Sequence, residues 1–368
     1  MAALINSLPI ALYLYITFLF VLGLALINYS AQNDRGEKYF CFLLGTQFTV
    51  LIAFYLLFGG YSIDAWRYLT RFTHNPFSFE TEWIFWIVGN FLSSNFPNPW
   101  PLKLLMALSI TIWGFAIFRM FGSDRKEEKV WAFLIVPLMP AFFFAMGNAI
   151  RQGLAAALIL HAVIYLLSRK RLQFWTISAT AILIHQVSII LVVAASLIRA
   201  PRKIVWAIFL IAPFVSYFLS FGLEQFDINL SDYVRYSTRD EGQFHYVKFF
   251  VYYGIAGILL VMTSRQSSLV PVKLLSNVFV LMVSFSACML NYEVPFERLI
   301  LFADVLLPII FGFLVVHLNF GIGIKYCLWV GILFLGLLLW TSGSVQHTLS
   351  VGLEHVEKKW IDSYQIKD

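Results

Sequence analysis

Charged residues are scarce in this sequence. Only 12% of its 368 residues are Asp, Glu, Lys or Arg, about half of the roughly 25% found in soluble domains. Hydrophobic residues make up 60% and aromatic residues 18%, and the mean hydropathy is +0.79. Because so little polar surface cannot cover a soluble fold, the composition predicts a polytopic membrane protein. It excludes a cytosolic enzyme, a secreted disulfide scaffold and a nucleic-acid-binding module.

Cysteine is also rare, and the familiar catalytic motifs are missing. Cys41, Cys288 and Cys327 lie in or beside apolar runs without metal-ligand spacing, so we expect packing residues rather than disulfides, zinc ligands or nucleophiles. No glycine-rich phosphate loop ending in Lys-Ser or Lys-Thr is present, nor a His-Glu-x-x-His run or a Gly-x-Ser-x-Gly elbow. We therefore expect no ATP hydrolysis, no cofactor and no metal.

The long apolar runs predict an all-α, polytopic transmembrane helical bundle that forms one domain over 1–368. A helix needs about 20 apolar residues to cross a bilayer, and about 17 can suffice. The sequence predicts about ten full crossings, at 8–28, 39–58, 101–121, 130–147, 150–167, 204–220, 246–263, 272–290, 298–317 and 325–341. The first has no basic stretch before it and no small-residue cleavage site after it, so we expect it to be retained.

The basic residues indicate how the chain is oriented. The formal net charge is +6, and 11 of the 26 Lys and Arg residues lie in four short segments. These segments are 30–38, 122–129, 168–171 and 199–203. Since short basic loops stay in the cytoplasm, the positive charge records orientation rather than nucleic-acid binding.

Two apolar segments do not fit a full crossing. The segment 172–198 has basic flanks on both sides, so it must enter and leave the membrane on the cytoplasmic side, as two half-helices that meet near His185. The segment 83–95 is too short, and serine, asparagine and proline follow it, which predicts a re-entrant or interface-lying piece. Non-helical backbone at membrane depth needs surrounding protein or water, so we expect an outward-facing polar cavity.

Two loops and the tail are predicted on the outer side, at 59–82, 222–245 and 342–368. The first contains Asp64 and Arg67, which share one face if the segment is helical. That face could bind an anionic group, and Asp64 could either orient Arg67 or accept a proton. The alternative is a solvated interfacial helix.

Arg151 and Gln152 stand at the outer start of the predicted crossing 150–167. The planar guanidinium of arginine suits phosphate oxygens, and the free N–H groups of a helix start attract the same anions. A cation there is otherwise disfavoured by the helix dipole. The alternative is that Arg151 is an interhelical partner for a carboxylate or a carbonyl.

His185 and Arg298 are the last two polar residues whose position in or beside an apolar run indicates a functional role. A histidine at the predicted hairpin apex could act as a general base, or it could bond a backbone carbonyl freed by the helix break. Arg298 could be a second phosphate ligand, or it could be neutralised by Glu297 or Asp304. His161 and His317 lack such a context, and we expect packing or interface roles for them.

These motifs together resemble the EpsG family, the Wzy-like polymerases of bacterial exopolysaccharide and O-antigen. The resemblance is strongest between about 59 and 200. The residues that carry it are Asp64-x-x-Arg67-Tyr68, the run Arg151-Gln152-Gly153-Leu154-Ala155-Ala156-Ala157, the basic turn 169–171, His185 with Ser188, and Glu297-Arg298.

The resemblance implies a multi-pass polymerase of the bacterial inner membrane. It would transfer a growing glycan from undecaprenyl diphosphate to the terminal sugar of another lipid-linked repeat unit, on the outer face. The lipid diphosphate is already an activated leaving group, so no cofactor is needed. We assign the acceptor's base to His185 first and Asp64 second. Diphosphate binding is assigned to Arg151, Arg298, Arg67 and Gln152. A chain-length-regulating co-polymerase is the expected protein partner.

Two other functions fit the same composition. A lipid-phosphosugar-dependent, GT-C-like glycosyltransferase would add one sugar and would place its catalytic carboxylate at Asp64. A flippase for the lipid-linked oligosaccharide would show internal inverted repeats and charges along a path through the membrane. No repeat is evident in the sequence, and the polar clusters gather on one side.

Overall fold

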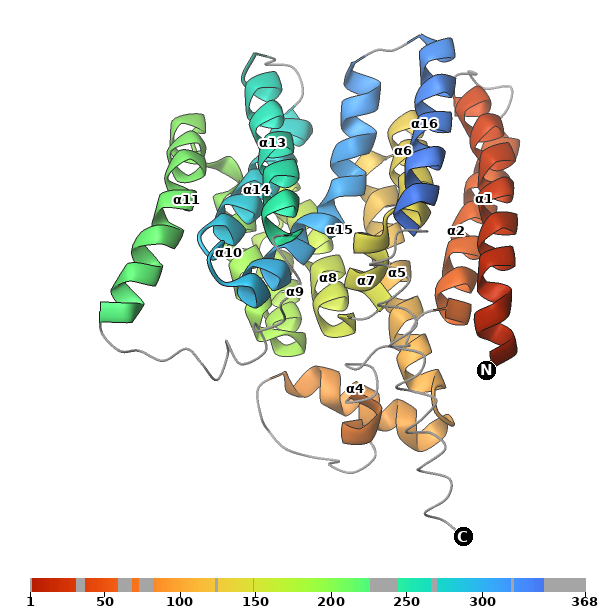
Figure 1. Cartoon of the computed structure of the whole chain (residues 1–368), viewed down its shortest axis with the longest axis horizontal. Helices are drawn as coiled ribbons and strands as arrows, with labels where there is room; N and C mark the ends of the chain where they lie inside the picture. Colours follow the sequence, from red (N-terminus) through yellow and green to blue (C-terminus); the bar gives the residue numbers. More distant parts are fainter. Residues whose placement is uncertain are drawn as a thin grey trace.

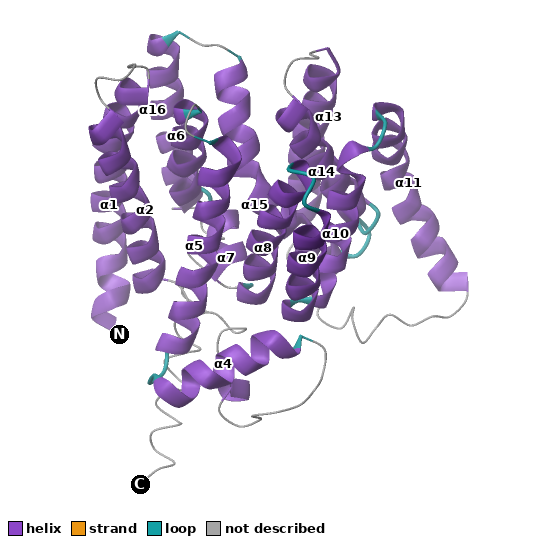
Figure 2. Ribbon diagram, turned by 180° about the vertical axis from the view of Figure 1, so that it is seen from behind, coloured by secondary structure: helices purple, strands orange, loops and turns teal. Residues whose placement is uncertain are grey.

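The computed structural model describes residues 2–30, 37–58, 68–72, 82–122, 125–147, 149–225, 244–265, 270–318 and 321–340. Within these ranges the regular structure is helical and contains no strand (Figure 2). The helices are α1 (Ala2–Ser30), α2 (Glu37–Phe58), α4 (Trp83–Asn95), α5 (Trp100–Phe121), α6 (Lys126–Ile135), α7 (Pro140–Gly147), α8 (Ile150–Leu167), α9 (Arg171–Ile184), α10 (Ile189–Ser196), α11 (Arg202–Gln225), α13 (Phe244–Arg265), α14 (Val270–Ala287), α15 (Glu293–His317) and α16 (Ile322–Trp340). The all-α class is confirmed for the part of the chain described.

Six of these helices are long and apolar enough to cross a membrane. They are Trp100–Phe121, Ile150–Leu167, Arg202–Leu219, Tyr246–Thr263, Pro295–His317 and Ile322–Leu339. Four shorter apolar helices accompany them, at Thr17–Ser30, Lys38–Phe54, Gln186–Arg199 and Val272–Ala287. The chain is therefore a multi-pass membrane protein, although the six candidate spans fall short of the predicted count of about ten.

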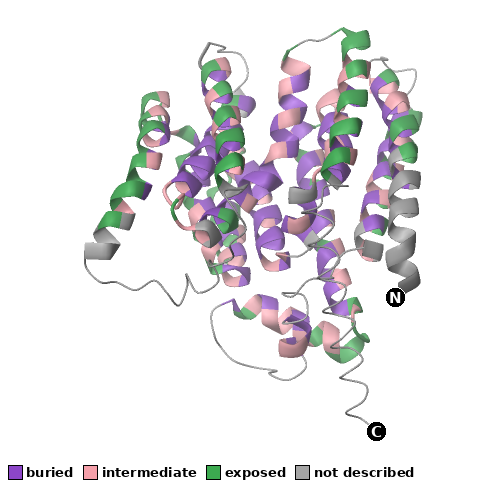
Figure 3. Cartoon of the chain, in the orientation of Figure 1, coloured by how far each residue is buried: buried purple, intermediate pink, exposed green. Residues whose placement is uncertain are grey.

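Three helices at the outside of the bundle expose apolar side chains. Large apolar side chains on α11, α13 and α16 are exposed, with Phe250 at 70%, Phe214 at 66% and Phe334 at 63% of their full accessibility. Figure 3 shows these three helices with exposed residues along much of their length. Soluble proteins rarely expose so many large apolar side chains, so these helix faces suit the hydrocarbon of a bilayer.

The predicted crossing 130–147 is not one continuous helix, because the chain breaks in its middle. Helix α6 ends at Ile135, a 3₁₀ turn follows at Val136–Leu138, and α7 begins at Pro140. Between them Met139 is extended, with φ −103° and ψ 99°. Proline has no N–H to donate and disfavours helical geometry in the residue before it, so Pro137 and Pro140 together interrupt the helix. The neighbouring turn of α6 is buried inside the protein, where irregular backbone is tolerated.

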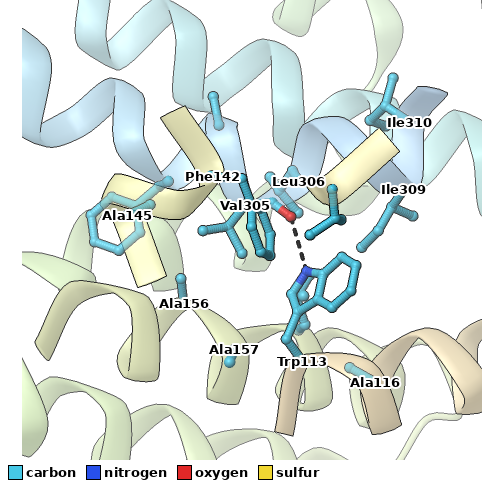
Figure 4. Packing of buried hydrophobic residues seen from close by; sticks show 14 of the residues in the cluster. Trp113, Ala116, Phe142, Ala145, Ala156, Ala157, Val305, Leu306, Ile309 and Ile310 are labelled. Carbon is cyan, nitrogen blue, oxygen red and sulfur yellow. Dashed lines mark hydrogen bonds between the residues drawn. The ribbon is translucent and has the colours of Figure 1, made fainter. Parts of the chain in front are cut away.

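The core around this break is centred on Trp113 of α5 (Figure 4). Its indole N–H donates to the carbonyl of Val305 in α15, at 3.2 Å. Its ring packs against Phe142 of α7 with 4.9 Å between the ring centroids. Ala156 and Ala157 of α8 line the same region (Figure 4) and are buried. Such small residues let membrane helices approach closely, which ties α5, α7, α8 and α15 into one core.

The segment 172–198 forms the predicted pair of half-helices. Helix α9 ends at Ile184, His185 is extended with φ −151° and ψ 107°, and α10 follows a 3₁₀ turn. On the returning arm, Arg199 Nη2 donates to the carbonyl of Leu166 at 3.5 Å. The end of the hairpin therefore lies beside the end of α8, on the side from which α9 departed.

Helix α4 lies across one end of the bundle rather than along it (Figures 1 and 2). It spans 13 residues and packs against α5 and α9. This arrangement agrees with the interface-lying segment predicted at 83–95. Most of the predicted outer loops 59–82 and 222–245, and the tail 342–368, lie outside the described residues.

Gly312 of α15 offers a test of how tightly the helices pack. A Cβ atom at this position would lie 2.5 Å from the backbone oxygen of Glu128 in α6. We expect Gly312→Ala to move α15 off α6 and to lower the stability by about 1–3 kcal/mol, the usual cost of overpacking. Thermal unfolding in detergent measures the change. Gly331→Ala in α16 is the matched control, because no atom lies within 4 Å of its Cβ, and equal melting temperatures for the two variants would contradict the packing.

Candidate functional site

The carboxylate of Glu82 joins three distant parts of the chain at the end of the bundle that α4 covers. Its Oε1 atom lies 2.6 Å from Nδ1 of His185, at the hairpin apex. The same oxygen accepts the backbone N–H of Gln186 at 3.2 Å. Its Oε2 atom accepts a hydrogen bond from the guanidinium of Arg151, in the first turn of α8. We refer to Glu82, Arg151 and His185 as the Glu82 cluster.

The contact with Glu82 orients the imidazole of His185. Because an ionised carboxylate only accepts hydrogen bonds, the proton in this contact sits on Nδ1. The other ring nitrogen, Nε2, is buried and has no hydrogen-bond partner among the described residues. The backbone of His185 is held separately, since its N–H donates to Ala181 at 2.9 Å and its carbonyl accepts the Ser188 hydroxyl at 2.6 Å. The ring therefore presents a nitrogen that can accept a proton, and it does not bond a carbonyl freed by the helix break.

Aromatic rings surround Arg151. Its guanidinium carbon lies 5.1 Å from the ring centroid of Tyr68, 5.4 Å from that of Trp86 and 6.0 Å from that of Phe85. Stacking of this kind holds a cation without neutralising it. The side chain is 26% exposed, so the rings and Glu82 do not enclose it completely. Glu82 is the carboxylate partner that the alternative interpretation of Arg151 predicted. Because the arginine side chain stays partly exposed, it can also bind an external anion.

Glu82 is ionised at neutral pH. It directly precedes α4 and lies outside the candidate membrane spans. Burial raises the pKa of its carboxyl, but the hydrogen bond from His185 and the charge of Arg151 outweigh burial and hold the pKa below its ordinary value of 4.5. The stabilisation from these contacts is thus present above pH 4.5 and is lost as the pH falls through the lowered pKa.

Gln152 and Arg298 lie next to the cluster. The Gln152 side chain is buried, and its amide donates to the backbone carbonyl of Arg298. Gln152 therefore holds the start of α15 against α8. The Arg298 side chain is exposed, and none of the residues that the structure describes pairs with its guanidinium. The backbone contact brings Arg298 to the start of α8, where Gln152 is the sequence neighbour of Arg151.

Asp304 does not neutralise Arg298, so that alternative is wrong. Its carboxylate is fully buried in α15, accepts the hydroxyl of Tyr252 and lies 3.5 Å from Lys248 Nζ. Both partners come from α13. The ion pair joins two helices inside the bundle, because a buried charge needs a close partner.

Two of the other predicted site residues cannot be placed, and two neighbouring candidates can. Asp64 and Arg67 lie outside the described residues. Arg71, on the same segment, is described: its guanidinium lies 4.2 Å from the ring of Trp86, which Arg151 also contacts. His161 bonds the carbonyl of Ile112 at 2.9 Å, as a packing residue would.

Sequence reasoning did not identify Glu82. It lies at the junction between a polar loop and an apolar run, in a chain with 20 acidic residues in total. An acidic residue placed directly before an apolar segment was the available signal. Its partners are 69 and 103 residues away, and only the fold shows that they meet.

The described residues contain no group of three or more His, Cys, Asp or Glu side chains that could hold a metal ion. The Glu82 cluster combines an oriented imidazole with a partly exposed arginine side chain. This pairing can accept a proton from a hydroxyl and can bind an anion beside it.

A family model described as the EpsG family matches residues 38–351. The match includes all three residues of the Glu82 cluster and Arg298. No curated protein and no solved structure shows a significant match to the chain.

Proposed function

The chain belongs to the EpsG family of Wzy-like polysaccharide polymerases, and from this membership we propose that it polymerises lipid-linked repeat units at the outer face of the bacterial inner membrane. The donor is a growing glycan on undecaprenyl diphosphate. The acceptor is the terminal sugar of a second lipid-linked repeat unit. Membership of the family supports the polymerase role, and the Glu82 cluster supports the site.

The observation that carries the proposal is the oriented His185 beside Arg151. The acceptor hydroxyl gives its proton to Nε2 of His185 while its oxygen attacks the anomeric carbon of the donor sugar. The bond between that carbon and the diphosphate oxygen breaks, and the diphosphate leaves with the electron pair. We expect inversion at the anomeric carbon, as in a single displacement.

The leaving diphosphate develops negative charge, which preorganised cations stabilise in the transition state. We assign this role to Arg151 and Arg298, with Arg67 assisting. Gln152 acts through its contact with the Arg298 backbone, as a positioning residue. Glu82 fixes the tautomer and the orientation of His185, and Asp64 stays the second candidate for the base.

No ATP or sugar nucleotide enters this reaction, because the lipid diphosphate is already activated. We therefore propose a metal-independent transfer without a cofactor. A co-polymerase that regulates chain length is the protein partner we propose.

Deleting the gene in the native bacterium tests the function. The surface polysaccharide and the lipid-linked intermediates are analysed together, with a strain complemented by the wild-type gene as control. We expect single complete repeat units at the surface and no long chains. Complete units trapped on the inner face would indicate a flippase instead. Repeat units that lack one sugar would indicate a lipid-phosphosugar glycosyltransferase.

A further inference from the structure

A small, mostly apolar pocket with a few polar groups lies at the opposite end of the bundle from the Glu82 cluster. It opens between the ends of α13, α14 and α15, with Thr263, Lys273 and His317 as its polar lining. Its apolar wall includes Met262, Phe313 and Leu314. None of these residues takes part in the proposed polymerase reaction.

The length of α15 places this pocket at the cytoplasmic interface. Arg298 lies near the outer start of α15, and His317 is its last residue. A helix rises 1.5 Å per residue, so the two positions are roughly 28 Å apart along the helix. This is close to the hydrocarbon thickness of about 30 Å. If Arg298 is at the outer interface, His317 is at the inner one.

The pocket contains polar groups that nothing in the described chain satisfies. Nε2 of His317 is buried and has no hydrogen-bond partner among the described residues. Lys273 is exposed, and no described side chain pairs with its ammonium group. By contrast, Lys325 on the neighbouring α16 is paired with Glu127 at 2.6 Å.

The surroundings of the pocket favour an anion. The sequence contains no Asp or Glu between 242 and 292, or between 305 and 353. Arg202 stands behind Thr263, to whose hydroxyl it donates. Lys273 lies in the first turns of α14 (Val270–Ala287), where the helix dipole and the free N–H groups attract negative charge.

We propose that this pocket binds the phosphate of an anionic lipid headgroup from the cytoplasmic leaflet. Lys273 and His317 contact the phosphate oxygens, and Thr263 lines the site beside them. Met262, Phe313 and Leu314 contact the first carbons of the acyl chains. A lipid fits better than a soluble phosphate because one wall is apolar and the pocket lies at membrane depth. Basic pockets between helices on this side of a membrane are suited to anionic headgroups.

Lipid binding to the purified full chain tests the proposal. The protein in detergent is titrated with dioleoyl phosphatidylglycerol, and separately with dioleoyl phosphatidylcholine, and native mass spectrometry counts the bound lipids. We expect tight binding of phosphatidylglycerol only. Lys273→Gln should weaken it about tenfold, because one charge-assisted contact to phosphate contributes about that factor. His317→Asn should weaken it by a smaller factor.

Two further variants control for charge and for folding. Lys203→Gln removes an exposed lysine of α11 that does not line the pocket, and it should bind phosphatidylglycerol as the wild type does. Leu314→Trp fills the pocket without changing the charge, and it should lose the lipid as Lys273→Gln does. Each variant must elute as a monodisperse peak before its affinity is compared.

Three outcomes would overturn the proposal. Equal affinities of Lys273→Gln and Lys203→Gln would mean that the lipid binds the basic surface generally. Equal binding of phosphatidylcholine would mean that headgroup charge is not recognised. Complete displacement of the lipid by inorganic phosphate alone would assign the pocket to a soluble phosphate.

Discussion

Replacing His185 with asparagine is expected to slow polymerisation by about 10²–10⁴-fold, the usual contribution of a general base. The asparagine amide can still donate to Glu82 from near the position of Nδ1, so the contact at the hairpin apex is kept. It offers no atom at the position of Nε2 that accepts a proton. The rate is measured in proteoliposomes supplied with a lipid-linked repeat unit, from the appearance of dimers and longer products on a gel.

A comparison with His185→Gln separates orientation from proton transfer. Glutamine places an amide near Nε2 but loses the contact with Glu82, and we expect it to be inactive as well. Because His185 is only 8% exposed, both variants need a monodisperse elution profile as evidence of folding. A wild-type rate for His185→Asn would remove His185 as the base and leave Asp64 as the candidate.

Replacing Arg151 with alanine should lower both the polymerisation rate and the stability. We expect a rate loss of about 10²–10³-fold, the size found when one stabilising group is removed from a transition state. The stability should fall because the buried carboxylate of Glu82 loses a charged partner, which costs about 1–3 kcal/mol. Arg151 is 26% exposed, and screening by solvent keeps the cost at the lower end of that range.

Arg151→Lys distinguishes the two effects. Lysine keeps a positive charge near Glu82, so its melting temperature should stay close to that of the wild type. It lacks the planar fork and the stacking of the guanidinium, so polymerisation should remain at least about tenfold slower, the equivalent of 1.4 kcal/mol. Arg171→Gln is the control for arginine loss, because Arg171 is an exposed arginine at the start of α9, away from the Glu82 cluster. Wild-type polymer from Arg151→Ala would show that the residue is only a structural partner of Glu82.

The sequence predicted a helix correctly wherever a single local property, such as the length of an apolar run or the position of basic residues, decided the structure. The apolar runs that became α5, α8, α11, α13 and α15 each have the length of a crossing, and hydrocarbon requires a helix there. The hairpin 172–198 followed from the basic residues on both of its flanks, without any knowledge of its packing. The break at His185 followed from the same argument.

At the helix break 136–139 two local signals disagree: the long apolar run favours one helix, and the two prolines favour an interruption. Pro137 and Pro140 were visible in the sequence, but proline occurs within membrane helices: α11 contains Pro213 and α15 contains Pro308. Whether a proline bends or breaks a helix depends on neighbours that can satisfy the freed backbone groups. Here Met139 precedes a second proline, and the segment is packed inside the bundle, so the chain separates into α6 and α7.

The candidate site was predictable only in part, for a related reason. Arg151 and His185 were recognisable because each stands at a helix boundary, where a polar residue is costly unless it has a role. Glu82 also stands at a helix boundary, directly before α4, but the sequence does not show which residues it contacts. Its importance depends on α4 lying across the end of the bundle, so that one carboxylate reaches two other helices. Helix orientation of that kind is set by tertiary packing and not by the local sequence.

The backbone of Glu82 has a consequence for engineering this chain. Glu82 has φ 73° and ψ 28°, in the left-handed region, where an ordinary L-residue loses roughly 1–2 kcal/mol. Glycine adopts that geometry without steric cost, but it would remove the carboxylate that Arg151 and His185 share. Stability and activity therefore oppose each other at this position. A stability-guided redesign would favour glycine, which the site cannot use, so position 82 should be held fixed in any such library.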